Sequence, residues 1–199
     1  KGLWADAMSA LRGEEFVDAR DAFAQLRRRY PRSALMKLYW AIAQTDVEPD
    51  DPTLGDVLEQ ITHTLKANPK GYFYLGKHHL RQQRYGEAVE ALEHALALRS
   101  TLERGFFLLG QAYEGLGDWS KAIDAFGRDQ RGGEGRIAIL AALARNYERT
   151  KRYADAANAL QAIADEHPTV AYHHYSLAQF YGRRGRRGRA RRLYALAKS

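Results

Sequence analysis

The sequence repeats itself with a period of 34 residues over most of its length. A leucine followed by a glycine or an alanine recurs at Leu75, Leu109, Leu143 and Leu177. Six positions of the repeat, which we call columns, stay in phase over four units. Their first members are Leu75, Gly76, His79, Tyr85, Ala88 and Leu92. A repeat of this length predicts small structural units that stack in a row, each burying its apolar face against its neighbours.

The spacing inside one unit predicts two antiparallel helices joined by a short turn. Gly76 and His79 fall on one face of a first helix, and the small residue allows a partner helix to approach closely. Tyr85 would begin the second helix, and Ala88 would be its tightest contact with the first. Glycines that suit a left-handed turn between the helices stand at Gly117 and Gly185. Prolines that would end repeats stand at Pro31, Pro69 and Pro168.

These columns resemble the tetratricopeptide repeat. The segments YFYLGKHHLRQQRYGEAVEALEHALAL and FFLLGQAYEGLGDWSKAIDAF, which start at Tyr72 and Phe106, are similar to its consensus. The first two units match less well, and unit two carries extra length in the turn DVEPDDPT. The resemblance covers essentially the whole chain. It implies an all-α, right-handed superhelical solenoid of antiparallel helix pairs, with the first helices lining a concave face.

We therefore expect one domain over residues 1–199, with repeats at about 1–33, 34–68, 69–102, 103–136, 137–170 and 171–199. Helix pairs are expected at roughly 2–30, 34–67, 71–98, 103–129, 136–165 and 171–198. The last helix carries Leu193, Tyr194 and Leu196 with no following unit to cover them. Either a longer native chain continues, which we favour, or this face meets another chain, including a second copy packed head to tail.

The resemblance also implies which side chains face the concave groove, because these are the positions of the first helices that do not pack internally. The predicted groove residues are Trp4, Leu35, Tyr39, Phe73, Tyr74, Lys77, Arg81, Arg104, Phe107, Gln111, Arg145, Arg149, Tyr172 and Tyr175. Leu38, Ile42 and Leu108 occupy similar positions, and the alternative for them is packing between neighbouring first helices. The groove is thus expected to be apolar towards its N-terminal end and basic, with tyrosines, towards its C-terminal end.

Such a groove predicts a protein scaffold or adaptor that binds a partner segment with apolar anchors and acidic residues. Some relatives bind the carboxylates of chaperone tails through lysine, asparagine and arginine side chains. Most matching positions here hold apolar residues, such as Phe73, Leu108, Ala138 and Ala142. Binding of chaperone tails by that mechanism is therefore not expected.

A local basic patch is the second functional candidate. The chain has a formal net charge of +7, and seven arginines gather near the C-terminus, at Arg183, Arg184, Arg186, Arg187, Arg189, Arg191 and Arg192. The patch predicts attraction to an acidic protein segment, which we favour, or to nucleic acid or an anionic membrane surface. The plain alternative is a solvated helix face.

No residue pattern predicts catalysis or a cofactor. The chain has no cysteine, which excludes disulfides and thiolate chemistry, and it has no phosphate-binding loop, HExxH motif or nucleophile elbow. His78 and His79 are adjacent, so they should point to different faces of a helix and not share a metal. We expect a binding protein and not an enzyme. The composition is compatible with the cytoplasm and also with the periplasm.

Overall fold

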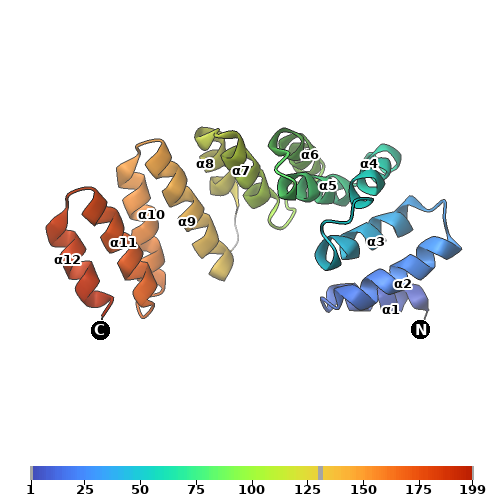
Figure 1. The fold of residues 1–199 in the computed structure, drawn as a ribbon, viewed down its shortest axis with the longest axis horizontal. Coiled ribbons are helices and arrows are strands. Elements are labelled where there is room, and N and C mark those ends of the chain that lie inside the picture. Colours follow the sequence, from blue (N-terminus) through green and yellow to red (C-terminus); the bar gives the residue numbers. More distant parts are fainter. Residues whose placement is uncertain (1, 130–131, 199) are drawn as a thin grey trace. The chain divides into compact units, whose positions relative to one another are not determined.

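The computed structural model describes residues 2–129 and 132–198, and this part of the chain contains twelve α-helices and no strand (Figure 1). The helices follow one another as six antiparallel pairs, so the predicted all-α architecture is confirmed. Their bounds are α1 Leu3–Arg12, α2 Phe16–Arg29, α3 Ala34–Val47, α4 Leu54–Thr64, α5 Pro69–Arg81, α6 Tyr85–Leu98, α7 Gly105–Leu116, α8 Trp119–Arg128, α9 Gly133–Arg149, α10 Tyr153–Glu166, α11 Ala171–Arg183 and α12 Arg187–Leu196.

The chain divides into two compact units, Lys1–Leu108 and Leu109–Ser199. In the first unit each helix from α1 to α6 packs against the next one along the chain. In the second unit the same holds for α8 to α12. Contacts between sequence neighbours are what a linear array of repeats requires. The single domain over residues 1–199 stays a prediction.

The core of the first unit is continuous over its first two repeats. Phe23 and Leu58 are fully buried, one from each of the first two repeats. The ring of Phe23 stacks on Tyr39, with ring centroids 5.4 Å apart. Aromatic pairs at this separation contribute about 0.5–1.5 kcal/mol beyond the burial of their surface. The core therefore extends from α2 into α3 without a break between the repeats.

The predicted alanine column is buried between the two helices of repeats three to six. Its members are all buried: Ala88, Ala122, Ala156 and Ala190. The column that begins at Gly76 lies on the first helix and is in close contact with the second. A Cβ atom added to Gly76 would lie 2.6 Å from Cγ of Leu92. A Cβ atom added to Gly110 would lie 2.6 Å from Cε1 of the buried Phe126 ring. The two helices of these pairs leave no space for a side chain at either glycine.

The turns inside the pairs contain a further column, which was not among the six of the sequence analysis. Its members have positive φ angles and stand at Gln83 (φ 59°), Gly117 (φ 75°), Lys151 (φ 61°) and Gly185 (φ 72°). The glycines were predicted in this conformation, and Gln83 and Lys151 were not. Glu14 (φ 60°) takes the same conformation in the first repeat. A non-glycine side chain there crowds the following carbonyl, which costs about 1–2 kcal/mol.

Repeat two replaces this turn with a longer one, as the insertion in the sequence indicates. Asp51 organises it, because its Oδ1 accepts hydrogen bonds from the backbone N–H and the hydroxyl of Thr53, at 2.8 and 2.7 Å. The Nε2 of the buried Gln44 donates to Oδ2 of Asp51 at 2.7 Å and to Oε2 of Glu48 at 3.2 Å. These side chains thus connect the end of α3 to Thr53, the residue before α4.

The glycine contact can be tested with two alanine substitutions in helices. Gly110→Ala should lower the free energy of unfolding by about 1–3 kcal/mol, because the new methyl group overlaps the ring of Phe126. The matched control is Gly86→Ala in α6, where nothing lies within 4 Å of the added Cβ atom. It should raise the free energy of unfolding by about 0.5–1 kcal/mol, because alanine favours the helix. Urea unfolding followed by circular dichroism measures both, and equal effects would contradict the close contact.

The turn column makes a separate prediction. Gln83→Gly and Lys151→Gly should each raise the free energy of unfolding by about 0.5–1 kcal/mol, because glycine removes the strain of the left-handed backbone. Gly117→Ala should lower it by about the same amount. Thermal unfolding of the three variants is the measurement. A loss of stability in both glycine variants would mean that these side chains make contacts that outweigh the strain.

Candidate functional site

The predicted groove residues of the first unit take part in its packing. Trp4 packs edge-on against Phe23 and Tyr39, with ring centroids 5.7 and 5.3 Å away. Phe73 and Tyr74 on α5 are half-buried and form an edge-to-face pair. Burial raises the pKa of Tyr74 to about 12, with a smaller contribution from the carboxylate of Asp46. Of the predicted residues in α3, Leu35 is exposed at the surface.

The two predicted groove cations of α5 contact the end of α3. The Nζ of Lys77 lies 2.8 Å from Oδ1 of Asp46, and the Nη1 of Arg81 donates to the carbonyl oxygen of Thr45 at 3.0 Å. Cations are favourable at the C-terminal end of a helix, where the carbonyl groups carry partial negative charge. These side chains therefore join repeat two to repeat three.

The remaining positions of the first unit separate into buried and exposed ones. Leu38, Ile42 and Leu108 are buried, which agrees with the alternative that they pack internally and do not line the groove. Arg104 was expected on the first helix of its repeat, but it stands one residue before α7, exposed and with a φ of 62°. Phe107 on α7 is half-buried, and so is Gln111, the first groove residue of the second unit.

A hollow of about 320 Å³ lies between α9 and α11 in the second unit. We call it the α9–α11 hollow. Ile137, Ala144 and Ile163 contribute its apolar surface, and Arg145 and Tyr172 line it as well. Arg145 and Tyr172 were both predicted to face the groove, and the structure brings them to the same depression.

Two acidic residues that the sequence analysis missed stand beside this hollow. The Nη2 of Arg145 lies 3.4 Å from Oε1 of Glu114, and the Nη2 of Arg183 lies 3.4 Å from Oε1 of Glu148. Both arginine side chains remain 62% exposed. Exposed pairs of this kind contribute about 0–1 kcal/mol, so the guanidinium groups stay available to another anion.

A buried asparagine strengthens the first of these connections. The Nδ2 of Asn146 donates to Oε1 of Glu114 at 2.6 Å and to the carbonyl oxygen of Ala142 at 2.8 Å. Asn146 is fully buried. Glu114 and Glu148 are 34 residues apart, so they form a column that the repeat pattern itself could have indicated. The basic character predicted for this end of the groove is therefore partly neutralised.

Two predicted groove residues face elsewhere. The guanidinium of Arg149 lies over the ring of Trp119 in α8, 5.4 Å from its centre. Tyr175 packs against Tyr194 of α12, with ring centroids 5.5 Å apart, and lines a separate hollow of about 550 Å³ at the end of the second unit. Tyr172 borders both hollows. Self-association through this end stays a prediction.

The predicted basic patch surrounds the turn between α11 and α12. Arg184 is held in place, because its guanidinium lies 3.5 Å from the ring centre of Tyr153 and its Nη2 lies 3.2 Å from Oε2 of Glu148. The Nη1 of Arg189 donates to the hydroxyl of Tyr181 at 3.3 Å. The other members, Arg186, Arg187, Arg191 and Arg192, are exposed and form no ion pair with any residue that the structure describes.

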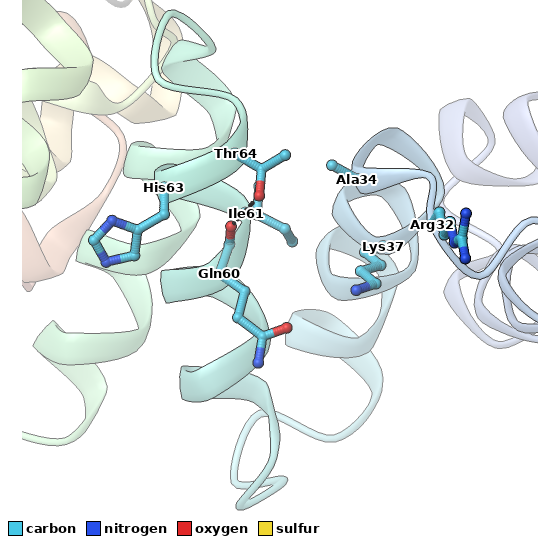
Figure 2. Close-up of a pocket in the computed structure, with 7 residues that line it drawn as sticks. All are labelled: Arg32, Ala34, Lys37, Gln60, Ile61, His63 and Thr64. Atoms are coloured by element: carbon cyan, nitrogen blue, oxygen red, sulfur yellow. Dashed lines mark hydrogen bonds between the residues drawn. The ribbon is translucent and has the colours of Figure 1, made fainter.

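A smaller hollow of about 260 Å³ lies between the start of α3 and the end of α4 (Figure 2). Lys37 lies on the α3 side and Gln60 on the α4 side, and Arg32 stands in the loop before α3. His63 points away from the gap in this view. The hydroxyl of Thr64 is already bonded to the carbonyl oxygen of Gln60 at 2.8 Å. No convergent polar groups that would bind a specific ligand are formed here by the residues drawn.

Two buried histidines, His78 and His79 on α5, expose 2% and 5% of their surface. The sequence analysis placed only His79 in the core; His78 is buried as well because it packs beside Gly55 of α4. The Nδ1 atom of each ring has no hydrogen-bond partner in the described part of the chain. Burial lowers the pKa of both, and the nearby Arg84 lowers it further. Within that part no three histidine or acidic side chains converge in a way that could hold a metal.

None of the helices in residues 2–129 and 132–198 combines the length and the apolar character that crossing a bilayer requires.

Comparison with known families identifies the repeat. Two sequence patterns, both described as Tetratricopeptide repeat, match residues 69–102 and residues 4–33, 105–128 and 142–169. Together they include more than half of the chain. Repeats two and six lie outside the matches, and repeat two is the one with the longer turn. A comparison with curated protein sequences finds no match.

Solved structures share the fold at low sequence identity. The C-terminal part of a TPR repeat-containing protein from Cytophaga hutchinsonii is 16% identical, with a TM-score of 0.77 over 96% of this chain and 76% of that one. MamA protein is 19% identical, with a TM-score of 0.68 over 85% and 92% of the two chains. The Cut9–Hcn1 hetero-tetramer of the APC/C is 19% identical, with a TM-score of 0.70; the match covers 98% of this chain and 39% of that one.

The buried histidines predict sensitivity to acid. Their pKa values are lowered in the folded state, so the unfolded chain binds more protons and the free energy of unfolding should fall as the pH drops below the ordinary histidine range, about 6.5. The substitution His79→Tyr introduces the residue that occupies the same column at Tyr113, Tyr147 and Tyr181. It should reduce the dependence of the free energy of unfolding on pH. Urea unfolding at neutral and mildly acidic pH tests it. An unchanged pH dependence in the variant would contradict the assignment to His79.

Proposed function

Because the chain belongs to the tetratricopeptide repeat family, whose members generally act as protein-interaction scaffolds without enzymatic activity, we propose that it binds a segment of a partner protein. The proposed binding site is the α9–α11 hollow. The observation that carries the proposal is the convergence of Tyr172, Arg145 and an apolar surface in one depression between two first helices.

Tyr172 supplies the main apolar anchor. It is 71% exposed, the most exposed of the large apolar side chains described. Tyrosine at the edge of a hollow provides a large rigid surface with a polar tip, and such residues often dominate binding energies at protein interfaces. Beside it Ile137 and Ala141 line the hollow without charge. A partner side chain of aliphatic or aromatic type would be buried here.

The polar groups around the hollow determine which side chains the rest of the partner segment should carry. Arg145 and Arg183 present exposed guanidinium groups, and Glu148, which also lines the hollow, orients Arg183. A carboxylate of the partner can accept paired hydrogen bonds from a guanidinium, an arrangement roughly twice as strong as one between neutral groups. We therefore propose a partner segment that combines an apolar anchor with one or more acidic residues.

The surface of α3 and α5 in the first unit is proposed as a further contact for partner proteins. Phe73 and Tyr74 are half-buried aromatic residues, and Leu35 is exposed on α3. Lys77 and Arg81 hold the two helices together at this surface. Their fixed position would help to keep the aromatic side chains in one arrangement.

Selection from a displayed library of random short peptides tests the proposal. Peptides enriched on the full chain should contain an aromatic or aliphatic residue near Asp or Glu. Their affinity should fall by about tenfold or more in Tyr172→Ala and in Arg145→Gln, as expected when a central contact worth about 1.4 kcal/mol is lost. The matched control is Tyr30→Ala, at an exposed tyrosine in the first unit. Binding that survives both hollow variants and is lost in the control would place the site elsewhere.

A further inference from the structure

We propose that the second unit has a second binding site, a cleft between α10 and α12 that takes an acidic segment of another protein. The cleft has a volume of about 980 Å³ and shares no lining residue with the α9–α11 hollow. Tyr153 and Ala157 of α10 form one wall. Five arginines line the other parts, and we call the site the arginine cleft after them: Arg184, Arg186, Arg187, Arg189 and Arg192.

Arg184 pairs with Glu148 outside the arginine cleft, and the other four arginines have no ion pair among the described residues. None of its lining residues is acidic. In the preceding repeat the positive charge at the corresponding place is paired, because the Nε of Arg152 at the start of α10 lies 2.7 Å from Oδ2 of Asp155. The residue 34 positions after Asp155 is Arg189, so α12 begins with further positive charge where α10 has an acid. Like charges that line one cleft repel one another, and an anionic occupant would relieve that repulsion.

Aromatic contacts hold two of these arginines in position. Arg184 lies 3.5 Å from the ring centre of Tyr153. Arg189 lies 5.4 Å from the ring centre of Tyr181 and donates to its hydroxyl at 3.3 Å. A guanidinium that is already oriented loses less conformational freedom on binding, and its planar fork matches a carboxylate. The cleft is thus arranged for carboxylates before any partner arrives.

The same contacts disfavour nucleic acid as the occupant. Single-stranded nucleic acid is bound without sequence preference by stacking its bases on open aromatic faces. Here arginines already cover faces of Tyr153 and Tyr181. A duplex or a membrane presents its phosphates on a convex or flat surface, which is too broad to enter a cleft between two helices. An acidic polypeptide can enter a cleft between helices, and its carboxylates match the guanidinium groups in charge and shape.

Fluorescence anisotropy with defined probes tests this on the full chain. The probe is a labelled peptide of alternating Glu and Ser, and the same peptide with Gln for Glu is the charge control. The wild-type chain should bind the Glu peptide and not the Gln peptide. In Arg186→Gln/Arg187→Gln/Arg192→Gln the affinity should fall by about tenfold or more. Arg184 is left in place because it also pairs with Glu148 beside the other hollow.

The matched control removes three positive charges from the first unit, in Arg28→Gln/Lys66→Gln/Arg99→Gln. These side chains are exposed and have no ion pair within the described residues. The control should change the affinity by less than about twofold. A second variant, Ala154→Trp, narrows the arginine cleft without changing its charge and should also weaken binding. Circular dichroism confirms that each variant is folded.

Several results would overturn the proposal. An equal loss in the two triple variants would mean that the peptide senses only net charge. Unchanged binding in Ala154→Trp would place the peptide outside the cleft. Tighter, patch-dependent binding of a short oligothymidylate or of phosphatidylserine vesicles would identify nucleic acid or membrane as the occupant. Binding of the Gln peptide with the same affinity would exclude recognition of carboxylates.

Discussion

Two helices of one repeat can lie in contact only where a small residue faces its partner, and the rest of the structure depends on this constraint. The alanine column is buried in four successive repeats, and Gly76 and Gly110 leave no room for a methyl group opposite Leu92 and Phe126. The separation of the helices is therefore set by steric contact at these positions. The α9–α11 hollow and the arginine cleft are each formed by two such pairs that follow one another along the chain.

Most of the fold could be predicted from the sequence because each repeat contacts only its neighbours. Tyr85, Trp119 and Tyr153 begin second helices as their column indicates. The left-handed turns at Gln83 and Lys151 could not be identified by residue type, because neither side chain favours that conformation. The only sequence signal for these two turns is that Gln83 and Lys151 fall in the column that contains Gly117 and Gly185.

The candidate site could be predicted only in part. Helix faces predicted that Arg145 and Tyr172 both face the groove, and in the structure both line the α9–α11 hollow. Glu114 and Glu148 were missed, since a contact between residues 31 to 36 positions apart depends on how successive repeats pack. Arg149 is one helical turn beyond Arg145, yet it turns to the ring of Trp119. Helical periodicity predicts the face of the helix on which a residue lies. It does not predict which aromatic ring on another helix a long side chain will contact.

The junctions between these repeats are modular. At each one an acidic residue near the end of a first helix is bound by polar side chains of the next repeat. Repeat five contains both halves of this device: Arg145 and Asn146 bind Glu114 of the previous repeat, and its own Glu148 receives Arg183 and Arg184. A tandem copy of this repeat would carry an arginine and an asparagine for the acid of its predecessor. Duplication of that segment could thus lengthen the array while preserving complementary polar groups at the new junction.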